Sequence, residues 1–166
     1  MQDKKRFLNI DFEEYDNSIK TIKVDEVHVL FYSEKNDLLS KNLSINKNLL
    51  SFLKNNITIN SSNFLIIRSE KGTFLLVKRK LQKDIKANDN YLEELGGNIY
   101  DSCKNIGFSN IRIYENEPYI NNKIALGILL SSYKFSNYKK IKSKKNESLH
   151  KVTFVCIGSK EITKKY

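Results

Sequence analysis

The sequence predicts an α/β sandwich in which a mixed β-sheet is flanked by helices. Apolar runs of four to eight residues alternate with stretches of helical period, in the order strand, helix, two strands, helix, strand, helix, strand. Crossover helices favour parallel pairing of the strands they connect, and a glycine turn joins one pair directly in antiparallel fashion. The length of 166 residues, 40% of them apolar, suits one domain.

Three strands and a short helix are expected in the first half of the core. Glu26–Ser33 has apolar side chains on both faces, which predicts a strand covered on both sides. Asn46–Asn56 carries leucines on one helical face and predicts an amphipathic helix. Asn63–Ser69 and Thr73–Lys80 predict a hairpin whose turn contains Gly72.

The clearest helix follows. Its apolar residues recur at three- and four-residue spacing, Asn88 or Asp89 can cap its start, and Gly107 ends it. Gly96 and Gly97 lie inside it, where each costs about 1 kcal/mol relative to alanine. Such a cost usually accompanies close backbone packing, here against the sheet or a neighbouring helix. No phosphate-binding glycine motif surrounds the pair.

Two strands and one more helix complete the core. Asn110–Tyr114 and Lys151–Gly158 are expected strands. Between them, Asn121–Tyr133 is a helix that is apolar nearly all round, so we expect it to be buried on more than one side.

One domain is therefore expected over residues 1–166, with a core at about 26–158. Residues 1–25 are an edge segment in which only Phe7–Phe12 predicts a strand. No apolar run approaches the roughly 20 residues that cross a bilayer, and the N-terminus is unlike a secretory signal. Cys103 and Cys156 lie in apolar segments and are expected to be buried and reduced. The sequence predicts a cytoplasmic protein that binds no membrane.

No constellation of catalytic or metal-binding residues can be identified. His28 and His150 are the two histidines, and neither they nor the cysteines have metal-ligand spacing. His28 lies inside a strand and is expected to be packed or hydrogen-bonded there. We predict no catalytic residue, no cofactor-binding residue and no metal ligand, and no cofactor is expected in this chain.

The basic segment from Lys134 to Lys151 is the strongest surface signal. Its 18 residues hold seven lysines and one acid, which is +6 of the net charge of +10. One interpretation is a nucleic-acid-binding module, and the other is a solvated loop. Lysine without arginine favours the loop, because base reading and bidentate phosphate contacts prefer arginine. The lysines that would contact nucleic acid are Lys134, Lys139, Lys140, Lys142, Lys144, Lys145 and Lys151.

The second half also carries a specific pattern. A hairpin strand precedes a helix with an internal Gly-Gly, then come a short strand, an apolar helix ending in Tyr-Lys-Phe-x-x-Tyr-Lys, a lysine-rich loop and a closing strand. This order resembles the N-terminal domain of the cytosol (leucyl) aminopeptidase family and its G-L-L-L-x-x-Y-R-F-x-x-Y-K helix end. The match is carried by Gly127, Leu129, Leu130, Tyr133, Phe135, Tyr138 and Lys139, with Lys134 where arginine is usual.

The resemblance implies roles for this chain. Family members are metal-dependent exopeptidases whose zinc or manganese ligands lie in a C-terminal domain with an N-T-D-A-E-G-R type motif. That motif does not occur here, so we expect a non-catalytic N-terminal domain that is inactive alone and partners its own catalytic domain where the gene encodes one. Gly96, Gly97, Gly127, Tyr133, Phe135 and Tyr138 would then be structural, with Tyr133 and Phe135 partly buried.

The resemblance also bears on partners. The family's N-terminal domain has a macro-domain-like fold and contributes to assembly of a hexamer, so a homo-oligomer is expected. Some bacterial members bind DNA, which keeps DNA as an alternative partner. A macro-like nucleotide binder is a weaker alternative, because the glycine-rich phosphate loops of macro domains are missing.

Overall fold

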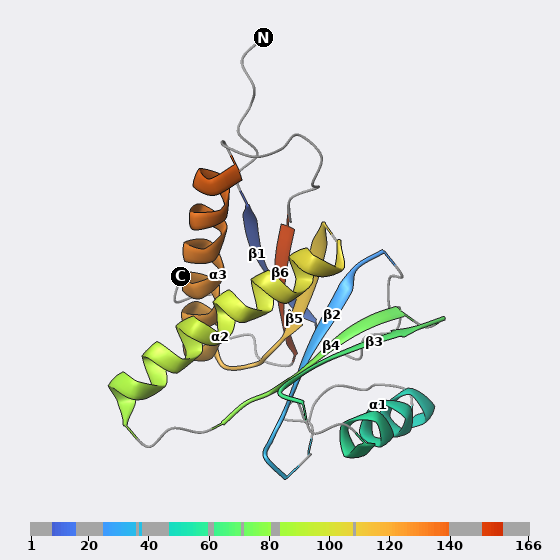
Figure 1. Ribbon diagram of the computed structural model, residues 1–166. Helices are drawn as coiled ribbons and strands as arrows, with labels where there is room; N and C mark the ends of the chain where they lie inside the picture. Colours follow the sequence, from blue (N-terminus) through green and yellow to red (C-terminus); the bar gives the residue numbers. More distant parts are fainter. Residues whose placement is uncertain are drawn as a thin grey trace.

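The computed structural model describes residues 8–15, 25–35, 37, 47–59, 62–70, 72–80, 84–107, 109–139 and 151–157, with the backbone alone at 14, 15, 59, 134–139, 156 and 157. The elements in chain order (Figure 1) are β1 (Asn9–Tyr15), β2 (Val27–Tyr32), α1 (Lys47–Ile59), β3 (Phe64–Ser69), β4 (Gly72–Lys78), α2 (Ile85–Ile106), β5 (Asn110–Tyr114), α3 (Pro118–Lys139) and β6 (Lys151–Ile157).

The six strands form one mixed sheet in the order β1-β6-β5-β2-β4-β3. Every neighbouring pair is parallel except β3 and β4, which form an antiparallel hairpin. Gly72 lies opposite Ser69 and has φ of 140°, a backbone conformation that favours glycine, so the hairpin predicted at Gly72 is confirmed. The predicted α/β sandwich with a mixed sheet is confirmed as well.

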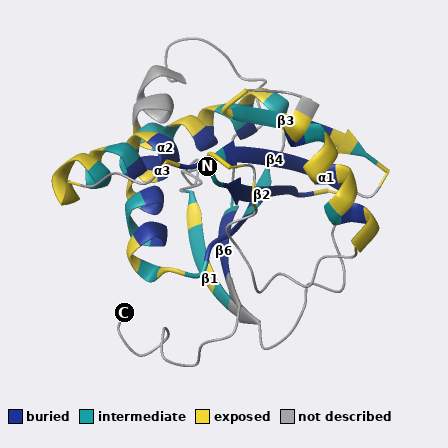
Figure 2. Cartoon of the chain, turned by 90° about the horizontal axis from the view of Figure 1, so that it is seen from below, coloured by how far each residue is buried: buried dark blue, intermediate teal, exposed yellow. Residues whose placement is uncertain are grey.

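Helices cover both faces of the sheet. Along the central strands, successive side chains point alternately to one covered face and to the other. Val27, Val29 and Phe31 of β2 pack in one core with α2 and α3. Leu30 and Tyr32, on the opposite face of the same strand, pack in a second core with α1. Figure 2 shows the buried strands β2 and β4 between these layers. The strand expected to be covered on both sides is therefore β2.

The boundaries of all three helices differ from the predictions, and α1 covers Lys47–Ile59 instead of Asn46–Asn56. Helix α2 begins at Ile85, and Asp84, with extended φ and ψ of −87° and 129°, precedes it, so the predicted caps at Asn88 or Asp89 are wrong. The first turn is exposed and therefore carries no apolar period, with Ile85 itself 77% exposed. Helix α3 covers Pro118–Lys139 instead of Asn121–Tyr133. It begins at Pro118 because proline fits the first helical position.

The edge strand of the first segment also lies further along than predicted. Strand β1 covers Asn9–Tyr15 instead of Phe7–Phe12, and it pairs in parallel with β6. Phe12 stacks on its register partner Phe154, with ring centroids 5.2 Å apart. Glu13 and Glu14, which follow Phe12, also pair with β6 and belong to the strand. Their charges interrupt the apolar pattern, so the sequence did not predict this part of β1.

Candidate assembly surface

Helix α3 holds most of the residues that carry the sequence pattern, and buried Glu115 fixes where it begins. Glu115 Oε1 accepts hydrogen bonds from the backbone N–H groups of Asn116 (2.9 Å) and Glu117 (3.2 Å). Asn121 Nδ2 donates to the Glu115 carbonyl oxygen at 2.9 Å. Glu115 Oε2 forms a buried ion pair with Arg79, which follows β4. One carboxylate thus connects the ends of β4 and β5 to the first turn of α3, where negative charge is favoured.

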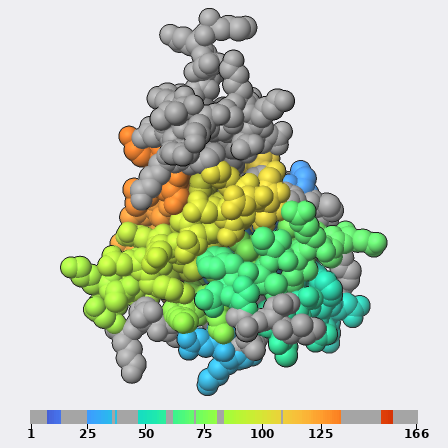
Figure 3. Space-filling view, viewed as in Figure 1, coloured from blue at the N-terminus to red at the C-terminus, as the bar shows by residue number. Residues whose placement is uncertain are grey.

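The inner side of α3 packs on the sheet and on α2. A methyl group added at Gly127 would overlap the carbonyl oxygen of Glu93 in α2, and one added at Gly96 would overlap the carbonyl oxygen of Ile124 in α3. The two helices therefore meet backbone to backbone. Gly97 differs, because its added methyl would lie 2.7 Å from the Ser131 hydroxyl oxygen, which can rotate away. Figure 3 shows α2 and α3 side by side at the surface.

An ion-pair cluster closes one side of this helix contact. Lys123 of α3 places its Nζ 3.6 Å from Asp89 Oδ2 and 3.8 Å from Glu93 Oε1, both in α2. All three side chains are partly exposed, so the pairs contribute little to stability. They do direct the charge of Lys123 toward α2 and away from the outer side of α3.

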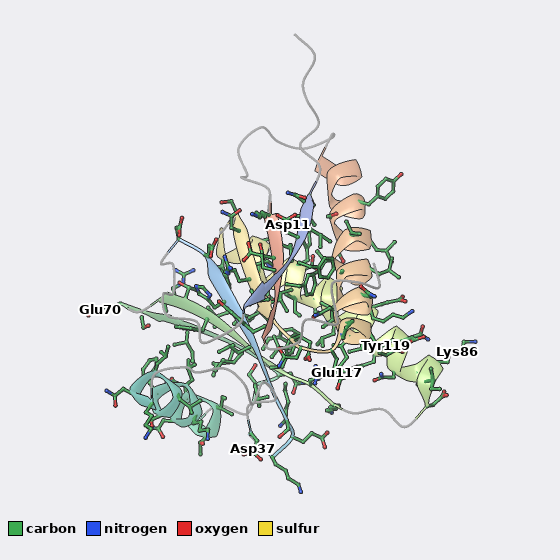
Figure 4. All side chains as sticks on the ribbon, turned by 180° about the vertical axis from the view of Figure 1, so that it is seen from behind. Asp11, Asp37, Glu70, Lys86, Glu117 and Tyr119 are labelled. Atoms are coloured by element: carbon green, nitrogen blue, oxygen red, sulfur yellow. The ribbon has the colours of Figure 1, made fainter. Side chains whose placement is uncertain are left out.

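The outer side of α3 is apolar and exposed. Five large side chains lie there, and we call them the outer stripe: Tyr119 (43% exposed), Leu126 (41%), Leu129 (44%), Leu130 (49%) and Tyr133 (66%). At 100° per residue they fall within about 100° of the helix circumference. Figure 4 shows α3 at the edge of the molecule with Tyr119 near its start.

Helix α3 is buried on two sides, against the sheet and against α2, as expected of Asn121–Tyr133, and it is exposed along the outer stripe. Tyr133, which was expected to be partly buried, is 66% exposed. The physical reason is the position of α3 in the fold. The helix is the outermost element of its layer, with the sheet on one side and α2 on the next.

The basic segment is only partly within the described residues. Lys134 and Lys139 lie in the last turns of α3 and not in a loop. Lys151 begins β6, and its Nζ lies 3.3 Å from Asp11 Oδ2 of β1. The backbone alone is described at Phe135 and Tyr138, and the lysines outside the description are Lys140, Lys142, Lys144 and Lys145.

A second polar cluster, which the sequence reasoning missed, lies on the sheet face that α1 shares. His28 Nδ1 is 2.7 Å from the Tyr114 hydroxyl, so the predicted hydrogen-bonded strand histidine is confirmed. Arg112 lies with one nitrogen 2.5 Å from Glu13 Oε2 and another 3.6 Å from Glu26 Oε2. The guanidinium thus connects β1 to the sheet centre. A charged residue flanked by isoleucines in β5 was the available signal.

Reactive groups are scarce within the part of the chain that the structure describes. No group of three or more His, Cys, Asp or Glu side chains there could hold a metal ion. His150 lies outside that part. Burial raises the pKa of Cys103 to about 12, so its thiol stays protonated at neutral pH and is a poor nucleophile. Among the described helices, none is long and apolar enough to cross a membrane.

Comparison with known proteins shows a likeness in fold. No protein-family model matches the sequence, and no curated protein matches it either. A solved structure of tomato leucine aminopeptidase, carrying a lysine-to-glutamate mutation, is similar with a TM-score of 0.64 at 14% sequence identity. The likeness covers 97% of this chain and 35% of the tomato chain. At this identity the likeness shows the fold, and the chain spans about a third of the length of the protein it resembles.

Proposed function

We propose that this chain is a non-catalytic domain of a leucyl-aminopeptidase-like protein, equivalent to the family's N-terminal domain, and that it serves assembly and positioning. The observation that supports this most is the fold likeness to about a third of tomato leucine aminopeptidase. The sequence pattern from Gly127 to Lys139 supports the same family, because seven of its positions match that family's helix end.

The contacts of α2 and α3 support a structural role for the pattern. Gly127, which the pattern contains, is where α3 meets the α2 backbone. Leu129, Leu130 and Tyr133 of the same pattern lie on the exposed outer stripe. The pattern therefore combines an internal helix contact with an external apolar surface, which suits a domain that packs against something else.

The proposal includes partners that would supply the chemistry. A catalytic domain, in the same or another polypeptide, would hold the zinc or manganese ions and remove N-terminal amino acids. This chain would contribute to a homo-oligomer, and the whole protein would be cytoplasmic.

Purified chain tests the non-catalytic part of the proposal. The chain is incubated with leucine amides in the presence of Zn²⁺ or Mn²⁺, and released amine is measured against a known leucine aminopeptidase. We expect no hydrolysis above the metal-only blank. Metal-dependent hydrolysis that follows the chain through purification would overturn the proposal.

A further inference from the structure

Two neighbouring strands at the centre of the sheet send the chain in opposite directions. β2 and β5 lie side by side and are parallel. From β2 the chain continues through α1 to β3 and β4 on one side, whereas from β5 it continues through α3 to β6 on the other side. Helices α1 and α3 also pack on opposite faces of the sheet. In parallel α/β sheets, ligands bind at the carboxyl ends of the strands at such a switch point.

Two groups at this switch point would suit an anionic ligand. The first is Arg79, which follows β4 and donates its backbone N–H to the carbonyl oxygen of Tyr32, the last residue of β2. Its guanidinium is nine-tenths buried, with Cζ 5.4 Å from the ring centroid of Phe31. A charge buried so deeply requires an opposite partner. The second group is the start of α3, where unpaired backbone N–H groups and the helix dipole favour negative charge.

The chain's own carboxylate occupies this position. Glu115 follows β5, and its side chain is buried. One carboxylate oxygen, Oε2, pairs with Nη1 of Arg79, and the other, Oε1, accepts from the backbone N–H groups of Asn116 and Glu117. These are the donors that a bound carboxylate or phosphate would use. A second anion at the same place would find them taken and would be repelled by the Glu115 charge.

We infer that Glu115 is an internal ligand, which fills an oxyanion-binding position at the switch point of the sheet. The wild-type chain therefore binds no free carboxylate or phosphate there, whereas a chain that lacks this side chain does. A nucleotide phosphate at the switch point would need the same donors, so the inference opposes the macro-like nucleotide alternative. Because Glu115 also fixes the start of α3, contacts that hold a ligand in other α/β sheets position a helix in this one.

Rescue by formate tests the inference. Glu115→Ala leaves the Arg79 guanidinium buried without its partner, so the melting temperature should fall by about 10 °C or more. Formate supplies a carboxylate that is small enough for the vacated space. It should raise the melting temperature of this variant in a saturable manner, by about 5 °C at about 20 times its dissociation constant.

Two variants separate this site from general effects of salt, and every measurement is compared with sodium chloride at the same concentration. Glu117→Ala is the matched control, because Glu117 lies two residues further on and is exposed. This variant and wild type should show no saturable response to formate. The double variant Arg79→Met with Glu115→Ala should lose the response, because it lacks the buried cation that binds the anion.

Three results would overturn the inference: Glu115→Ala that does not respond to formate, wild type that responds equally, or a double variant that keeps the full response. If Glu115→Ala does not fold in buffer, circular dichroism in formate becomes the measurement. Recovery of the native spectrum then supports the inference, and a chain still unfolded at about 0.5 M formate overturns it. None of these results depends on whether the chain partners an aminopeptidase.

Discussion

Replacing Gly127 by alanine should destabilise the protein even though alanine is the better helix former. The new methyl would overlap the carbonyl oxygen of Glu93, which belongs to the backbone of α2. Because the atoms that would collide belong to the backbone, no side-chain rotation can relieve the overlap, and the two helices would have to separate. The same reasoning applies to Gly96, whose added methyl would overlap the carbonyl oxygen of Ile124.

Two opposed effects decide the magnitude. Alanine gains about 1 kcal/mol over glycine in a helix interior. Overpacking costs about 1–3 kcal/mol, and a contact with rigid backbone belongs at the upper end of that range. The net loss for Gly127→Ala is therefore about 2 kcal/mol, which in a chain of this length lowers the melting temperature by about 4–8 °C.

Gly97→Ala supplies the control. Its methyl would meet the Ser131 hydroxyl, which can rotate, so the gain in helix propensity should roughly offset the contact and leave stability nearly unchanged. Urea unfolding followed by circular dichroism gives the free energy of each variant. The reasoning is refuted if Gly127→Ala is neutral or stabilising, or if Gly97→Ala is the more damaging change.

Three further predictions concern the buried charges, the buried thiol and the lysines. Arg112→Met should cost about 2 kcal/mol in urea unfolding, because Glu13 and Glu26 lose their shared partner, whereas exposed Arg68→Met should change stability by less than about 0.5 kcal/mol; equal effects would contradict the buried role. Burial raises the pKa of Cys103 to about 12, so the folded thiol stays protonated while the unfolded thiol ionises. The free energy of unfolding should therefore fall by up to about 1.4 kcal/mol per pH unit above about pH 9, and Cys103→Ala should remove that slope. Duplex DNA should bind only weakly at physiological salt, with a dissociation constant of about 10⁻⁴ to 10⁻⁶ M. A filter or anisotropy assay measures this binding in wild type and in a variant with five lysines replaced by glutamine: Lys139, Lys140, Lys142, Lys144 and Lys145. Tight binding by wild type that the variant loses would make nucleic-acid binding the primary function.

The elements with a regular period could be predicted from the sequence, and the ends of the helices could not. β5 was predicted residue for residue, because polar and apolar residues alternate along NIRIY. The start of α2 at Ile85 was missed, because its first turn is exposed and carries no apolar repeat. Periodicity reports burial, and an exposed turn of helix leaves no such trace.

The exposed side of α3 and the buried ion pairs could not be predicted from the sequence, because they depend on tertiary contacts that periodicity does not report. An apolar helix such as α3 predicts burial on more than one side, and only the layer order shows that Leu126 and Leu130 face outward. The contacts of Arg112 with Glu13 and Glu26 join residues far apart in sequence, through the parallel pairing of β1, β6 and β5. No local pattern could have specified those partners.

The central claim, that this chain positions an aminopeptidase without catalysing the reaction, is tested most directly in the cells that make it. A tag fused to the N-terminus of the protein, introduced at its chromosomal gene, would capture the protein together with everything covalently or tightly attached to it. We predict that the captured material hydrolyses leucine amides with Mn²⁺ or Zn²⁺, whereas the recombinant 166-residue chain does not. Captured material without that activity, or activity in the recombinant chain alone, would contradict the account.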